Sequence, residues 1–254
     1  LQKILKDKFK LPIYEVCNGY NLKDYLFTNK KDKIFNKNTL TISYTGNLYY
    51  GKRDPKLLFE SIKIISKNFK NYKINFYGRN MPNLKYQINE FGLEKNVKIF
   101  NEVSYQKSLE IQQKSDLLLL ILWNSKEEYG VFSGKFFEYV GARRPILYVG
   151  PKKNIVANEI NKRNLGFVCS NKREITETLM ECYNKKKKFG YLKENSKHQI
   201  KGLSRQDQFK KILPFISKFK YKKIIIITKK LNIGGTEKHL LNIVTSLKNK
   251  FQIE

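Results

Sequence analysis

Apolar side chains recur along the chain with two different spacings. Short apolar runs bounded by Gly, Asn or Pro predict strands, whereas apolar residues three and four positions apart predict helices. Leu58, Ile62 and Ile65, for example, follow the helix-start pair Asp54-Pro55 at helical spacing. The predicted strands are 39–46, 73–78, 96–100, 116–122, 145–150 and 166–169. The predicted helices are 54–65, 82–91, 104–115, 133–141, 152–163 and 172–188.

These strands and helices alternate, and no hairpin signal separates them. The alternation predicts an α/β fold with a doubly wound parallel sheet, Rossmann-like, with helices on both faces. The run DLLLLIL (116–122) is continuously apolar, which is typical of a strand covered on both faces. Ligands of such sheets lie beyond the carboxyl ends of the strands. Glycine turns fall there at Gly46, Gly78 and 130–134, so we expect them to share one site.

The segment GVFSGKFFEYVGARRPIL (130–147) carries the clearest chemistry. Its helix should open at Ser133 or Gly134, where exposed N–H groups attract anions. Lys135 adds a positive charge at that end, and Glu138 lies one turn further on. The pattern predicts a phosphate site with a carboxylate beside it for a sugar hydroxyl.

The other side chains of this segment have structural interpretations. We expect the aromatic residues Phe136, Phe137 and Tyr139 to belong to the core. The next pair, Arg143 and Arg144, should lie at the helix end, where a positive charge favours the helix dipole. A second basic group, the lysine run 185–188, is typical of a solvated helix end, with contact to anionic lipid as the alternative.

The net charge of the chain is +29, from 51 Lys and Arg against 22 Asp and Glu. Such a charge suggests nucleic acid or an anionic membrane surface as a partner. The basic residues are spread along the whole sequence, without a zinc-finger or RNA-binding signature. We therefore interpret the charge mainly as compositional drift, expect no nucleic-acid partner, and keep peripheral contact with an anionic membrane as an expectation.

Cysteine usage and hydropathy bear on location. Cys17, Cys169 and Cys182 are isolated from one another, which fits a reducing cytoplasm without a metal site. The longest apolar run, 117–123, is too short to span a bilayer, and no signal peptide is visible. We expect a cytoplasmic protein, with the inner face of the membrane as a more specific alternative.

Three ordered motifs resemble a known family. They are YTGNLYYGKRDPKLLFESI (44–62), VSYQKSLEIQQKSDLLLLI (103–121) and SGKFFEYVGARRPIL (133–147). Together they are similar to the C-terminal, donor-binding domain of GT-B glycosyltransferases, and more narrowly to the retaining family called glycosyltransferase group 1. The resemblance implies transfer of a hexose-type sugar from a nucleotide-diphosphate donor to a glycan or lipid-linked acceptor, as in polysaccharide biosynthesis.

The resemblance also implies roles for individual residues. The glutamate that matches Glu138 binds ribose hydroxyls, and the helix start Ser133-Gly134-Lys135 lies at the donor diphosphate. The basic residue that matches Lys52 holds the same diphosphate, and Arg53 beside it is a candidate for that role. The remaining donor-binding candidates are Gly46, Asn47 and Arg79. The family needs no metal ion or other cofactor, because cations and helix-end amides stabilise the leaving group.

Two positions depart from the family pattern. Many members carry a glutamate eight residues before the ribose-binding one, and Gly130 stands there in this chain. Glu128 is close enough for a small shift of the loop to supply a carboxylate, so we take Glu128 and Lys52 as the catalytic candidates. Many members also carry an arginine directly after the first glycine, where this chain has Asn47.

The ends of the chain suggest further domains. We expect residues 1–37 to be the end of an acceptor-side domain plus linker, 38–190 the nucleotide-sugar domain, and 191–220 terminal helices and linker. Residues 221–254 resemble the start of a second acceptor-side domain, with Gly234 and Gly235 in its glycine loop. The chain would then be a piece of a tandem protein, incomplete for turnover. The alternatives are a non-catalytic nucleotide-binding remnant, a basic nucleic-acid-binding or membrane-surface-binding protein, and an epimerase or phosphorylase of the same fold.

Overall fold

The computed structural model describes residues 7–8, 15–25, 37–48, 51–79, 81–216, 223–224 and 252–253. They fall into two compact units, of which one comprises Tyr20–Lys201 and the other comprises Leu1–Gly19 with Gly202–Glu254. No helix among the described residues is both long and apolar enough to cross a bilayer.

The unit Tyr20–Lys201 is built on one six-stranded sheet of order β3-β2-β1-β4-β5-β6, in which every neighbouring pair is parallel. Its strands are β1 (Leu40–Thr45), β2 (Tyr72–Tyr77), β3 (Val97–Phe100), β4 (Leu117–Ile121), β5 (Ile146–Val149) and β6 (Gly166–Cys169). Its helices are η1 (Leu22–Tyr25), α2 (Lys56–Ile65), α3 (Pro82–Glu90), α4 (Tyr105–Gln113), η3 (Lys126–Glu128), α5 (Gly134–Ala142), α6 (Ile155–Arg163), α7 (Lys172–Phe189) and α8 (Lys197–Ile200). The doubly wound α/β class predicted from the sequence is confirmed.

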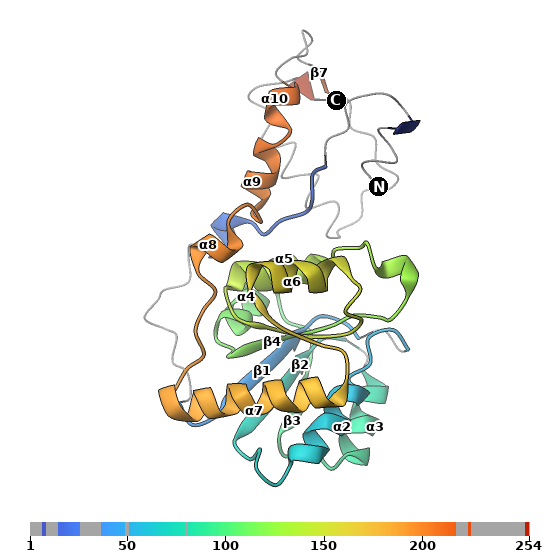
Figure 1. Ribbon diagram of the computed structural model, residues 1–254, viewed down its shortest axis with the longest axis vertical. Coiled ribbons are helices and arrows are strands. Elements are labelled where there is room, and N and C mark those ends of the chain that lie inside the picture. The colour runs from blue at the N-terminus through green and yellow to red at the C-terminus, as the bar shows by residue number, and fades with distance from the viewer. Residues whose placement is uncertain are drawn as a thin grey trace. The chain divides into compact units, whose positions relative to one another are not determined.

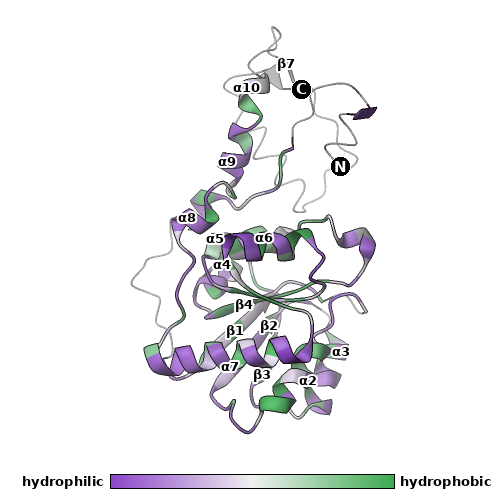
Figure 2. Cartoon of the chain, in the orientation of Figure 1, coloured by the Kyte–Doolittle hydropathy of each residue, from purple (hydrophilic) through white to green (hydrophobic). Residues whose placement is uncertain are grey.

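Helices cover both faces of this sheet, with α4, α5 and α6 on one and α2, α3 and α7 on the other (Figure 1). All five residues of β4 are buried, as its apolar run predicts. Figure 2 shows hydrophobic strands inside, while α7 is mainly hydrophilic in colour. The aromatic residues Phe136, Phe137 and Tyr139 of α5 are at most 1% exposed, which confirms them as core.

Side-chain caps fix the helix starts that the sequence indicates. The hydroxyl of Ser104 accepts from the backbone N–H of Lys107 at 3.3 Å and so caps α4. Ser133 caps α5 in the same way, accepting from the N–H of Phe136 at 3.3 Å. Such caps satisfy amides that have no partner within the helix, so the first turn of each helix is defined locally.

A buried ionic cluster corrects two predictions at the amino ends of the strands. Lys186 of α7 is only 1% exposed, and its Nζ donates to Asp116 Oδ1 at 2.8 Å. Arg144, also 1% exposed, lies 4.0 Å from the same carboxylate oxygen and 3.5 Å from Glu194. The interpretation of 185–188 as a wholly solvated helix end is therefore wrong for Lys186. Arg144 likewise belongs to the core and not to an exposed helix end. A buried cation requires an anion close by, and Asp116 and Glu194 supply it.

The other unit contains the short helices α9 (Arg205–Lys210) and α10 (Leu213–Ile216) and the strands β7 (Lys223–Ile224) and β8 (Gln252–Ile253). Arg205 Nε donates to the Gly19 carbonyl at 2.9 Å, which fixes the first turn of α9 to residues near the N-terminus. Strands β7 and β8 pair in parallel. The predicted loop that holds Gly234 and Gly235 lies outside the described residues. The domain boundaries given above stay predictions.

Candidate functional site

The topological switch point of the sheet lies between β1 and β4, the first strands of its two halves. From β1 the chain winds outward through β2 and β3, and from β4 it winds outward through β5 and β6. The loops that follow β1 and β4 therefore diverge, and this is the place where doubly wound sheets form their ligand crevice. Gly46 follows β1, and its N–H donates to the carbonyl of Tyr77 at 2.7 Å. A Cβ on Gly78 would lie 2.6 Å from the Gly46 carbonyl oxygen, so these two turns touch.

Lys135 joins the third glycine-bearing loop to the same place. Its Nζ donates to the carbonyl of Thr45, the last residue of β1, and lies 4.2 Å from the centre of the Tyr44 ring. A side chain on Gly46 would collide with this ammonium group, and the φ of Gly46 is +115°. The backbone conformation therefore favours glycine there, and a side chain would in addition displace Lys135 from Thr45. The structure brings the three predicted turns together.

The surroundings of Lys135 change its titration. Burial lowers the pKa of Lys135 to about 8, with Arg53 adding to the decrease and Glu138 opposing it. Arg53 is therefore close enough to act on the ammonium group through its charge. A lysine in this condition carries most of its positive charge at neutral pH and gains from a nearby anion.

Glu138 lies three residues after Lys135, on the same side of α5. Its carboxylate Oε2 is 3.4 Å from Nε2 of Gln112, and its backbone carbonyl accepts from Tyr25 Oη at 2.8 Å. Tyr25 belongs to η1, and burial raises its pKa, with Tyr105 and Glu138 adding to the effect. A carboxylate at the edge of a crevice is a suitable acceptor for a pair of hydroxyl groups.

The loop after β1 supplies further cations. Lys52 is exposed, and its Nζ lies 4.7 Å from the centre of the Trp123 ring, just after β4. Asn47 accepts from the backbone N–H of Arg79 at 2.9 Å, and the Arg79 guanidinium pairs with Glu102. The sequence does not indicate Trp123 as a site residue. Its place directly after a buried strand at the switch point is the signal that would have identified it.

The loop between β4 and α5 carries the remaining candidate, Glu128. It ends the short helix η3, and its carbonyl accepts from Asn154 Nδ2 at 3.3 Å and from the N–H of Val131 at 3.1 Å. Gly130 is exposed, and a Cβ there would meet nothing within 4 Å. The Glu128 backbone is thus held within the loop between β4 and α5, whereas Gly130 contributes no functional group.

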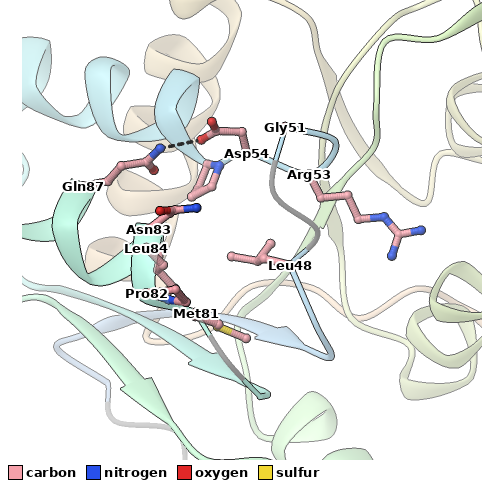
Figure 3. Close-up of a pocket in the computed structure, with 10 residues that line it drawn as sticks. Leu48, Gly51, Arg53, Asp54, Met81, Pro82, Asn83, Leu84 and Gln87 are labelled. Carbon is pink, nitrogen blue, oxygen red and sulfur yellow. Dashed lines mark hydrogen bonds between the residues drawn. The ribbon is translucent and has the colours of Figure 1, made fainter.

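A pocket of about 160 Å³ lies between the loop after β1 and the start of α3 (Figure 3). Leu48, Met81 and Leu84 make its apolar wall, and Gln87 donates to Asp54 at 2.9 Å above it. Arg53 lines this pocket, but its guanidinium points away from those side chains (Figure 3). The described residues contain no group of three or more His, Cys, Asp or Glu placed to hold a metal ion.

No protein-family model matches the sequence, and no curated protein matches it. Solved structures share the fold. A glycosyltransferase from Rickettsia africae aligns with a TM-score of 0.60 at 14% identity, over 84% of this chain and 59% of that one. WaaG, a glycosyltransferase of lipopolysaccharide biosynthesis, gives 0.60 at 15%, over 82% and 58%. HepE of Anabaena, solved with UDP and glucose, gives 0.58 at 14%, over 80% and 56%.

The chain spans less than two thirds of each of these proteins. At such identities the likeness is one of fold, and the function of the neighbours does not transfer with it. The Rossmann-like unit of this chain is therefore of the kind that occurs in GT-B glycosyltransferases.

Proposed function

We propose that the unit Tyr20–Lys201 binds a nucleoside-diphosphate sugar and forms the donor-binding part of a glycosyltransferase. The observation that carries the proposal is the geometry of α5. Its capped first turn presents backbone amides, and Lys135 and Glu138 stand three residues apart beside the end of β1. This arrangement suits a ligand with an anionic group next to a diol, which is the chemistry of a ribonucleotide.

The cations and amides would hold the diphosphate. The backbone N–H groups of Ser133 and Gly134 would donate to the phosphate oxygens, and Lys135, Lys52 and Arg53 would supply positive charge around them. The attraction between these groups and the diphosphate becomes stronger as the glycosidic bond breaks, because the leaving diphosphate gains negative charge. In this proposal the three side chains supply the counter-charge that a metal ion would otherwise give, so we expect affinity to survive EDTA.

The sugar end of the donor would lie toward the loop between β4 and α5. There Glu128 is the carboxylate we assign to the donor sugar, with Lys52 as the second catalytic candidate. We infer transfer with retention, to a glycan or lipid-linked acceptor, from the resemblance of the three sequence motifs. A non-catalytic binding unit is the second candidate function, and the absence of a side chain at Gly130 favours it.

Thermal unfolding of the chain against UDP, GDP, ADP and their sugars, at low and high salt, tests the proposal. A ligand at about 100 times its dissociation constant stabilises the folded state by about 2.7 kcal/mol. That corresponds to a rise of roughly 5–10 °C in a unit of this size. We expect a shift with one base that survives high salt. Salt-sensitive binding to DNA without any nucleotide shift would overturn the proposal.

Glu138→Ala makes the test specific to the site. The variant should abolish the nucleotide shift and leave the unfolding temperature without ligand nearly unchanged. Glu177→Ala is the matched control, since Glu177 is an exposed glutamate of α7 far from the crevice. Equal nucleotide affinity in the two variants would contradict the assignment of Glu138.

A further inference from the structure

Thr45, the last residue of β1, is the point at which the candidate site is joined to the sheet. Its N–H donates to Tyr139 Oη at 3.2 Å, its Oγ1 accepts from Gln112 Nε2 at 3.0 Å, and its carbonyl accepts from Lys135. Lys135 and Tyr139 are four residues apart on α5, with Glu138 between them. Both α4 and α5 are therefore fixed to the same residue of the sheet.

Gln112 is the member of this network that also reaches the carboxylate. It is 0% exposed, and its Nε2 lies 3.4 Å from Glu138 Oε2 in addition to the bond to Thr45. Its Oε1 is buried and has no hydrogen-bond partner. Nε2 therefore lies within hydrogen-bond distance of two oxygen atoms, one on the sheet and one on Glu138, and these two contacts favour a single orientation of the amide.

We propose that Gln112 is a positioning residue that holds the Glu138 carboxylate ready for the ribose diol. The inference rests on the proposed function, because it concerns the same site. A half-buried glutamate side chain has several rotamers, and holding it in one before the ligand arrives removes part of the entropy cost of binding. Gln112 achieves this with a neutral donor, so the charge of Glu138 stays available for the ligand.

The amide is the only common side chain of this size that can do so. Leucine has no donor, and its side chain ends one bond short of the glutamine nitrogen. Glutamate has the same shape, but it would place a second carboxylate against Glu138, and two such groups at this distance cannot both ionise easily. The pKa of one carboxyl group of the pair then rises. The Gln112→Glu variant gains a donor hydroxyl only when that carboxyl group is protonated, which happens at low pH. Among the described residues, the titratable groups on which the charge of Glu138 acts include Lys135 and Tyr139 from α5 and Tyr25 from η1.

The experiment measures affinity for UDP and for 2′-deoxy-UDP by calorimetry, with the guanosine or adenosine pair if that base binds. The wild type should prefer the ribonucleotide by about tenfold or more, as expected for a hydrogen bond to a charged group. Gln112→Leu should reduce this preference to less than about threefold and leave the deoxynucleotide affinity unchanged. Gln113→Leu is the control, because Gln113 is the next residue of α4, is 7% exposed and makes no hydrogen bond to Glu138 in the described part of the chain.

Gln112→Glu keeps the test decisive even if the leucine variant folds poorly. Its preference for the ribonucleotide should be absent at pH 8 and return at pH 5, while the wild type keeps its preference at both. An unchanged preference in Gln112→Leu, or a Gln112→Glu variant without pH dependence, would overturn the inference and leave the proposed function standing. A wild type that binds neither nucleotide would overturn the proposed function and this inference together.

Discussion

Replacing Lys186 with methionine tests the buried ionic cluster of Lys186, Asp116 and Arg144 at the amino ends of the strands. Methionine keeps most of the volume of the lysine stem and removes its ammonium group. Asp116, 1% exposed, then loses the partner at 2.8 Å and, among the described residues, keeps the side-chain contacts with the N–H of Thr41 at 2.9 Å and the more distant Arg144 at 4.0 Å. The change therefore leaves a buried carboxylate only partly compensated.

The expected cost follows from this geometry. Removing one partner of a buried ion pair destabilises a protein by about 3–5 kcal/mol, because the other charge stays buried. The two groups that still contact Asp116 place Lys186→Met at about 3 kcal/mol, the lower end of that range. For a unit of this size, each kcal/mol lowers the unfolding temperature by about 2–4 °C, so the expected decrease is roughly 6–12 °C.

Thermal and urea unfolding of the full chain measure the effect. Lys187→Met is the control, since Lys187 is the exposed neighbour on the same helix and should change stability by less than about 0.5 kcal/mol. The midpoint in urea should fall for Lys186→Met with an unchanged dependence on urea concentration. If both variants unfold within about 1 °C of the wild type, the cluster does not stabilise the fold and the reasoning is wrong.

Three further predictions concern the crevice. Nucleotide affinity should fall as pH rises above about 8, because Lys135 loses its proton there, and Lys135→Arg should flatten this profile in calorimetry. Gly46→Ala should cost about 1–3 kcal/mol and weaken nucleotide binding. Gly51→Ala, also at positive φ but facing open space, should retain binding, and equal losses would refute the role of Gly46. Since Trp123 is the single tryptophan, nucleotide binding should change its fluorescence by drawing Lys52 from its ring, and Lys52→Ala should abolish that change.

Much of the fold can be read from local patterns of this sequence. Every predicted strand from 39–46 to 166–169 is present, because each is a short run rich in apolar residues between segments of helical or turn character. The start of α5 can also be predicted locally, because Ser133 caps the helix by accepting from a residue only three positions away. The spacing of Lys135 and Glu138 places both on one side of a helix by helical geometry alone.

The tertiary structure decided which distant residues meet around the site and in the buried ionic cluster. Gln112 reaches Thr45 across 67 positions, Tyr25 reaches Glu138 across 113, and Lys186 reaches Asp116 across 70. A glutamine, a tyrosine or a lysine in a polar helix has the same local signature whether it is exposed or buried. Its environment depends on which strand lies beneath the helix, and strand order in a parallel sheet is set by long crossover connections. The sequence determined the elements and the chemistry of α5, and the packing of distant elements around Thr45 and Asp116 determined how that chemistry is held.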